Sequence, residues 1–460
     1  MSNFVRSSKY RHVYCDPPKP HQTISGFRLS STTGEQSYIK CSSKYLSVSV
    51  SGGGGPFVVH PINDPGRKAN FSKVVGHSGA VLDTDWNPFD DDMVASASED
   101  GTIKIWQVPK EGMIENITTP IVDLRGHGRK VTLLRFNPTA SSVLASTGGD
   151  QTVKIWDIEQ GNEITTFSGN TDLSQDIVWD CNGDNLAVSC KDKNVRIIDG
   201  RNSAASSVIQ APHEGSKSVK LAYLGSTTTI ASVGFTRQSQ RELKIWDLRN
   251  VSTGPLKKID IDQAAGVIMP FYDPDTSVLY LSGKGDGNVR YYEYVKSDPY
   301  CFPLSEFRST TSCKGMCMVP KRALDVMNCE TARMLKLTPN DGVQQLRFTV
   351  PRKSEMFQED IFPPTYAGVP AHTADEWREG SSKSPVTMSL NPSSSSDSVL
   401  SRSGSSSPKP FKTVATLTKD LNDAEEKIKK LEGRIRNESK ASEERISELE
   451  GMLRDNGIEF

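Results

Sequence analysis

The stretch GHSGAVLDTDWNPFDDDMVASASEDGTIKIW at residues 76–106 decides the fold of this chain, because a second stretch repeats it. Residues 126–156 read GHGRKVTLLRFNPTASSVLASTGGDQTVKIW. The two stretches share an opening Gly-His, a central Asn-Pro, an Ala-Ser run before an acidic turn, and a closing Lys-Ile-Trp. Agreement at so many separated positions indicates an internal repeat.

Each copy has the length and the markers of a WD repeat, which forms one four-stranded blade of a β-propeller. Residues 94–96 and 102–106 have the alternation of strands in a half-buried sheet. Asp100-Gly101 between them is a tight turn, since both residue types tolerate left-handed backbone dihedrals. The repeats therefore predict an all-β propeller.

In WD repeats the opening His, a strand Ser or Thr, the turn Asp and the closing Trp form a buried chain of hydrogen bonds. A buried imidazole and a buried carboxylate need such partners. The matching residues are His77, Ser96, Asp100 and Trp106 in the first copy, and His127, Ser146, Asp150 and Trp156 in the second. A His-Asp-Ser set can be mistaken for a catalytic triad, but its recurrence in both copies favours a structural cause.

Three weaker copies follow the two clear ones. His213 stands where the second of them needs its opening His. The steps between successive closing residues are 50, 42, 48 and 46 residues, close to a blade period of roughly 40–45 plus insertions; these residues are Trp106, Trp156, Ile198, Trp246 and Tyr292. With a divergent blade around Val59 and a last one at 323–337 the count is seven. A strand near residues 10–14 is available to close the ring.

The bulk properties exclude several classes of protein. The 460 residues have a net charge of -1, so no overall field attracts the chain to nucleic acid or to an anionic membrane. The eight cysteines are scattered along the chain. Cys313 and Cys317 are close in sequence, but no second pair and no His stand near them, so we interpret the cysteines as reduced thiols rather than as disulfides or metal ligands. We find no apolar core of signal-peptide length and no membrane span. These features favour a cytoplasmic protein without metal or cofactor.

Composition divides the chain into four parts. We expect the propeller to occupy residues 1–350 and an extension, 351–380, to pack on it. Residues 381–411 are mostly Ser, Pro and Gly, which predicts a disordered linker. Residues 412–455 carry the pattern of an α-helical coiled coil.

The tail has a heptad seam of apolar residues with charged residues between them. The seam weakens after residue 435 and resumes 11 residues later, a heptad plus a four-residue stutter. A lone helix with so narrow an apolar stripe gains little, which favours self-association over a solitary charged helix. The seam residues singled out are Leu421, Ile428, Leu431, Ile435, Ile446 and Leu449.

A WD-repeat propeller followed by a Ser-rich linker and a terminal coiled coil resembles the coronin family. Four stretches make the resemblance close: VRSSKYRHV at 5–13, PHEG at 212–215, DPDTSVLYLSGKGDGNVRYYE at 273–293 and PRKSEMFQEDIFPPTY at 351–366. The resemblance covers residues 1–366 closely and the tail by its architecture. In the tail, RISELE at 445–450 fits a coronin pattern.

That tail motif has a physical mechanism. With Ile446 and Leu449 facing the seam, Arg445 can pair with Glu450 of a neighbouring helix while its methylenes cover the seam. In the family this arrangement goes with trimers, whereas Ile at a with Leu at d alone favours two strands. We follow the motif and expect a homo-oligomer that is a trimer.

The resemblance implies a protein that binds filamentous actin and acts with the Arp2/3 complex and cofilin in actin turnover, in the actin-rich cell cortex. The family's actin-contact arginine lies in a stretch like Arg-Val-Ser-x-Thr-Thr-Trp. Residues 28–34 read RLSSTTG, so Arg28 is the matching residue, while Gly34 stands where the family has Trp. Further basic candidates are Arg6, Lys9 and Arg11. Oligomerisation would let several weak sites bind one filament at once and so raise the overall affinity.

Two other classes of function compete with actin binding. A WD-repeat adaptor in trafficking or signalling, without actin contact, would have the same propeller, and substitution of Arg28 separates it from an actin-binding protein. An enzyme is not expected, because no metal cluster, phosphate loop or paired-carboxylate site survives comparison with the repeat.

Overall fold

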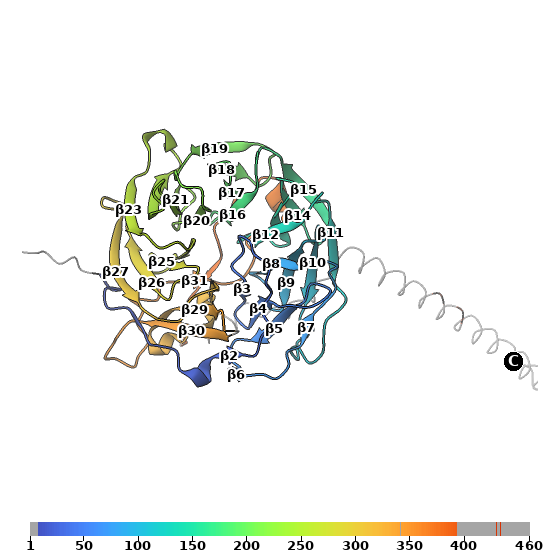
Figure 1. Cartoon of the computed structure of the whole chain (residues 1–460), viewed down its shortest axis with the longest axis horizontal. Helices are drawn as coiled ribbons and strands as arrows, with labels where there is room; N and C mark the ends of the chain where they lie inside the picture. The colour runs from blue at the N-terminus through green and yellow to red at the C-terminus, as the bar shows by residue number, and fades with distance from the viewer. Residues whose placement is uncertain (1–7, 341, 393–428, 430–432, 434–460) are drawn as a thin grey trace, which may run out of the picture. The chain divides into compact units, whose positions relative to one another are not determined.

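The structure is a computed structural model that describes residues 8–340, 342–392, 429 and 433. Within these residues, six four-stranded sheets and one larger sheet stand as blades around a central axis (Figure 1). This is the predicted seven-bladed β-propeller. The first strands of neighbouring blades contact one another, so they line the central channel.

Six blades each consist of four antiparallel strands. Blade 1 contains β3 (Ile39–Cys41), β4 (Tyr45–Ser49), β5 (Phe57–Pro61) and β7 (Lys73–Val74). Blade 2 contains β8 (Val81–Trp86), β9 (Met93–Ser98), β10 (Thr102–Gln107) and β11 (Val122–Arg125). Blade 3 contains β12 (Val131–Phe136), β13 (Val143–Gly148), β14 (Val153–Asp157) and β15 (Asn162–Phe167).

The next three blades follow the same order. Blade 4 contains β16 (Ser174–Trp179), β17 (Asn185–Cys190), β18 (Asn194–Asp199) and β19 (Ala205–Gln210). Blade 5 contains β20 (Lys220–Tyr223), β21 (Thr229–Phe235), β22 (Arg241–Asp247) and β23 (Lys257–Asp262). Blade 6 contains β24 (Ile268–Asp273), β25 (Val278–Gly283), β26 (Val289–Tyr294) and β27 (Cys301–Phe307).

Strand register shows that the closing residues of the repeats are structurally equivalent. Each closing residue lies on the third strand of its blade and pairs with the second residue of the second strand, as Trp106 does with Val94 and Tyr292 with Leu279. The other pairs are Trp156 with Leu144, Ile198 with Leu186, and Trp246 with Ile230. All five closing side chains are buried. Ile198 and Tyr292 therefore fill the Trp position of the repeat.

Blade 7 joins the two ends of the propeller. It contains β28 (Gly315–Met318), β29 (Glu330–Thr338) and β30 (Gly342–Thr349), with β1 (Tyr14–Cys15), β2 (Ile24–Ser25) and β6 (Gly66–Arg67) from the N-terminal region. β2 runs antiparallel along the start of β30, and β1 pairs with the end of the same strand. The N-terminal segment thus closes the ring, as predicted. The first part of the predicted last blade instead forms the short 3-10 helices Lys321–Ala323 and Val326–Asn328.

Residues 351–392 run across one end of the blades. Ala140 forms a parallel bridge with His372, and the Tyr366 hydroxyl donates to the Pro138 carbonyl at 2.9 Å. Helix α1 (Ala374–Arg378) begins with a capping box made by Thr373 and Glu376. Its Trp377 is fully buried against Trp179. The extension is therefore part of the propeller's packing.

The structure differs from the prediction of a linker that begins at residue 381. Strand β32 (Thr387–Met388) pairs with β31 (Thr365–Tyr366), and the Ser382 hydroxyl bonds to the Asp184 carboxylate. A Ser-rich composition did not show this, because the contacts depend on surfaces supplied by the blades. The proposed coiled coil lies outside the described residues, except for Lys429 and Gly433, which are helical. No helix in the described part has the length and apolar character to cross a membrane.

The propeller has two faces, which we name for what lies on them. The turn face carries the turns between the second and third strands of the blades, such as those at Asp100 and Asp150. The extension face carries the loops between the first and second strands and is crossed by residues 351–392. β30 starts at the turn face and ends at the extension face.

Candidate functional site

The predicted chain of hydrogen bonds is present in blades 2 and 3. Trp106 Nε1 donates to Ser96 Oγ at 2.8 Å, while the His77 ring bonds to Ser96 Oγ at 2.7 Å and to the Asp100 carboxylate at 3.0 Å. In blade 3 the corresponding set is His127, Ser146, Asp150 and Trp156, with distances of 2.8–3.0 Å. Burial lowers the pKa of both histidines, which favours the neutral form of the rings. The hydrogen bonds of these side chains all lie within the blades and stabilise them.

Blade 5 contains a third set that sequence reasoning only half identified. His213 bonds to Ser232 at 2.8 Å, and Trp246 Nε1 donates to Ser232 at 2.9 Å. The acidic partner is Glu242, whose carboxylate lies 2.8 Å from His213 Nδ1. The residue stands on strand β22, four positions before Trp246, rather than in the preceding turn. Its extra methylene lets a strand residue replace the turn Asp.

In blade 6 the acidic residue of the turn, Asp286, pairs with an arginine instead of a histidine. Asp286 accepts a 2.6 Å bond from Arg241, whose side chain is 1% exposed and also pairs with Asp262 at 2.5 Å. The glycine-rich run at 283–287 is therefore the turn of a blade anchored by a buried arginine, and not a phosphate loop. Within the described ranges, no group of three or more His, Cys, Asp and Glu residues is placed to hold a metal ion.

Arg28 lies on the turn face, in the connection from β2 to β3. Gly26 precedes it with a φ of +111°, and a Cβ atom there would lie 2.3 Å from the Lys68 carbonyl oxygen. Phe27 is 2% exposed and stacks on Phe71 at a centroid distance of 4.4 Å. The Arg28 carbonyl accepts from the Ser51 amide at 2.8 Å. A fixed backbone thus presents the Arg28 side chain to solvent.

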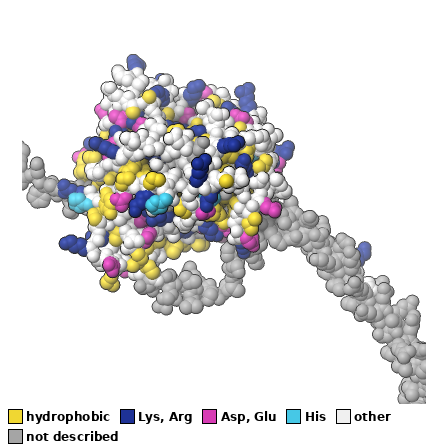
Figure 2. Space-filling view, turned by 60° about the horizontal axis from the view of Figure 1, so that its bottom comes forward, with side chains coloured by type: hydrophobic (Ala, Val, Ile, Leu, Met, Phe, Trp, Pro, Cys, Tyr) yellow, Lys and Arg dark blue, Asp and Glu magenta, His cyan; other side chains and the backbone are white. Residues whose placement is uncertain are grey.

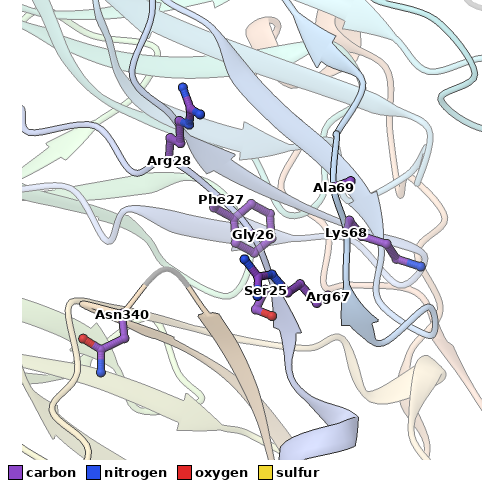
Figure 3. Close-up of a pocket in the computed structure, with 8 residues that line it drawn as sticks. All are labelled: Ser25, Gly26, Phe27, Arg28, Arg67, Lys68, Ala69 and Asn340. Atoms are coloured by element: carbon purple, nitrogen blue, oxygen red, sulfur yellow. The ribbon is translucent and has the colours of Figure 1, made fainter.

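An open pocket of about 840 Å³ lies beside Arg28 (Figure 3). Arg67 and Lys68 line it too, brought there because β6 pairs in parallel with β2. Lys68 pairs with Asp64 at 2.6 Å, whereas Arg67 is exposed. Asn340 contributes from the turn before β30. We name Arg28, Arg67 and Lys68 the basic patch; sequence reasoning missed its last two members, since only the tertiary pairing unites them.

Gly34, where the family has Trp, lies against a buried side chain. A Cβ atom at Gly34 would be 2.2 Å from Gln36 Oε1. The Gly34 carbonyl accepts from Lys284 at 3.2 Å, and its amide donates to the Tyr38 hydroxyl at 3.3 Å. Gln36 thus occupies the space into which a side chain at residue 34 would extend.

The other basic candidates do not lie near Arg28. Lys9 and Arg11 precede β1, at the end of β30 that meets the extension face; Lys9 donates to the Asp360 carbonyl at 2.8 Å. The registers of β1 and β2 on β30 are six residues apart, which corresponds to about 20 Å along the strand. Arg6 lies outside the described residues. The structure therefore separates Arg28 from Lys9 and Arg11.

Figure 2 shows Lys and Arg side chains scattered over one side of the molecule, with acidic and apolar side chains between them. This agrees with the net charge of -1. A partner must accordingly be recognised by local groups rather than by an overall field.

Comparison with known proteins places the chain. WD domain, G-beta repeat models match residues 70–107, 118–157 and 161–199, a further type of WD40 repeat matches 343–385, and a domain of unknown function (DUF1899) matches 3–67. Coronin-A of Dictyostelium discoideum is 44% identical over 392 residues, covering 85% of this chain and 87% of that protein. The chain belongs to the coronin family.

Two further coronins agree with this. Human Coronin-2A is 38% identical over 398 residues, covering 85% of this chain and 75% of that protein. The crystal structure of the WD40 domain of Toxoplasma gondii coronin superposes with a TM-score of 0.78 at 31% identity, covering 83% of this chain and 98% of that one. The coronin family is non-enzymatic. The His, Ser and acidic sets of this coronin are thus structural.

Proposed function

We propose that this chain binds actin filaments through the basic patch on its turn face and so regulates filament assembly and turnover. Membership of the coronin family supports actin as the partner, and the motif at residues 28–34 supports Arg28 as a contact. The observation that carries the proposal is the exposed Arg28 side chain on a backbone fixed by Gly26 and Phe27. Exposed arginines on a rigid support suit recognition of an acidic surface.

The tail completes the proposal. The heptad seam and the RISELE motif support a homo-trimer, in which several propellers bind one filament and gain avidity. The Arp2/3 complex and cofilin are proposed partners on the same grounds of family, and the cytoplasmic actin cortex is the proposed location.

Co-sedimentation with filamentous actin tests the proposal, with Arg28→Glu compared to Arg11→Glu. Both residues are exposed arginines, but they lie at opposite ends of β30. We expect Arg28→Glu to remain in the supernatant and Arg11→Glu to sediment like the unaltered chain. Equal sedimentation of both variants would remove Arg28 from the site. Absence of sedimentation of the unaltered chain at low salt would favour the adaptor function.

Oligomerisation has its own test. A chain that ends at Pro410 should have the mass of one propeller in sedimentation equilibrium, while the full chain should have three times its own mass. Ile446→Asp with Leu449→Asp should dissociate the full chain and weaken its filament binding to that of the truncated chain. A full chain that is monomeric at micromolar concentration would contradict the trimer.

A further inference from the structure

A second pocket lies at the centre of the turn face, where the central channel opens. We call it the mouth pocket; its volume is about 390 Å³. Its lining comes from the starts of the first, channel-lining strands and the residues before them in blades 1 to 6, and from Lys191 in the turn after β17. The residues that matter for its chemistry are Glu35, Gln36, Lys130, Lys191 and Lys217.

Residues of the β2–β3 connection form the floor of this pocket. Lys220 Nζ lies 3.0 Å from the Glu35 carboxylate and donates to the Glu35 carbonyl at 2.8 Å. Burial would raise the pKa of Glu35, but Lys220 and the Ser218 hydroxyl outweigh it and lower that pKa. Lys284 Nζ donates to the Gln36 carbonyl at 2.8 Å. Glu35, the one acidic residue of the lining, is thus favoured in its ionised form and already forms an ion pair with Lys220.

The floor contains a buried hydrogen-bond donor, the side-chain amide of Gln36, without an acceptor among the described residues. Gln36 is 3% exposed and lines the mouth pocket. Its side-chain Nε2 has no hydrogen-bond partner among the described residues. A buried amide donor left without an acceptor costs about 1–3 kcal/mol. An acceptor atom that reached Nε2 would satisfy it.

Lysines stand around the rim. Lys130 and Lys191 are exposed and come from blades 3 and 4, and over the described ranges neither forms an ion pair. Asp192, which follows Lys191, is bound by Arg196 at 2.7 Å. Lys217 is held in place, since its Nζ donates to the Ala265 carbonyl at 2.7 Å and lies 4.7 Å from the centre of the Phe235 ring. Three lysines therefore line a pocket whose one acidic residue, Glu35, is already paired with Lys220.

We propose that the mouth pocket binds a small soluble molecule with two or more phosphate groups. A phosphate carries a charge of about -1.5 to -2 near neutral pH and offers acceptor oxygens in several directions, whereas a carboxylate carries one charge in one plane. The donors approach from the floor and from three blades, which suits the tetrahedral group. Lys130 and Lys191 stand on different blades, which suits a ligand with more than one phosphate. This inference is independent of actin binding.

Isothermal titration of the full chain with sodium tripolyphosphate tests the inference. We expect saturable binding, weakened about tenfold by Lys130→Ala or by Lys191→Ala, since each removes a charged hydrogen bond. Gln36→Glu keeps the shape of the side chain but replaces the donor with a negative charge, and should abolish binding. The control is Lys110→Ala, an exposed lysine in the loop that follows β10, which should bind like the unaltered chain.

Several results would overturn the inference. Absence of heat with tripolyphosphate is one, and unchanged affinity in both rim lysine variants is another. A phosphoserine peptide or vesicles with phosphoinositide lipids, tested at equal phosphate concentration, must bind more weakly than tripolyphosphate; tighter binding of either would assign the pocket to a protein or a membrane instead. Thermal melting of Gln36→Glu checks that its loss of binding is not loss of fold.

Discussion

The two ends of β30 hold the N-terminal segment in different ways. At the extension face, Lys9 bonds to the Asp360 carbonyl and Tyr10 is buried with its hydroxyl 3.3 Å from the Ile361 carbonyl. At the turn face, the chain after β2 buries Phe27 but leaves Arg28 in solvent. Lys9 and Arg28 thus lie at opposite ends of β30, Lys9 bonded to the extension and Arg28 with its side chain in solvent. We expect contact with a partner at Arg28, because no hydrogen bond or ion pair within the described residues holds its side chain.

The largest effect should come from the covered face. Trp377→Ala removes a fully buried ring that packs on Trp179 and donates to the Gly183 carbonyl at 2.9 Å. We expect the free energy of unfolding to fall by about 3–5 kcal/mol in urea denaturation. Val369→Ala, on the same extension but 50% exposed, is the control and should change it by less than about 0.5 kcal/mol. A small effect of Trp377→Ala would mean that the extension is not part of the packing.

An intermediate effect is expected inside blade 5, near the turn face. His213, Lys244 and Lys258 outweigh burial and lower the pKa of Glu242 to about 2. Because the folded-state pKa lies below the ordinary value, this carboxylate stabilises the fold above about pH 4.5, and the stabilisation is lost as the pH falls towards 2. Glu242→Gln should cost about 1–3 kcal/mol at neutral pH and flatten the acid limb of a stability–pH profile. An unchanged acid limb would show that Glu242 does not contribute to it.

The smallest effect on stability is expected at the basic patch. Arg28→Glu changes an exposed side chain that forms no hydrogen bond or ion pair with the described residues, where only the Arg28 backbone carbonyl is bonded. The free energy of unfolding should stay within about 0.5 kcal/mol of the unaltered chain in the same urea measurement. A much larger loss would mean that Arg28 supports the closure of the ring, and filament binding by this variant would then need a separate check of its fold.

The blades were predictable because the same residue pattern recurs in several copies of the repeat. His77, Asp100 and Trp106 recur with fixed spacing, so their roles could be read without coordinates. Glu242 was missed because a strand residue took over the role of a turn residue, and its neighbours in sequence do not indicate this. His213 and Trp246 were identified in that blade without their acidic partner.

The candidate site was less predictable. The motif around residues 28–34 led to Arg28, but Arg67 joins it only through the parallel pairing of β6 with β2. Lys9 and Arg11 were named beside Arg28 as further basic candidates, and the length of β30 separates them from it. The linker was predicted to begin too early because composition does not reveal the pairing of β32 with β31.

Hydrogen exchange of the full chain, free and bound to actin filaments, tests the division between the two faces most directly. The account predicts slower exchange on filaments in the peptides that contain residues 26–34 and 64–69, and unchanged exchange in those that cover 351–388. Protection of the extension without protection of the basic patch would contradict it and would place the filament on the opposite face.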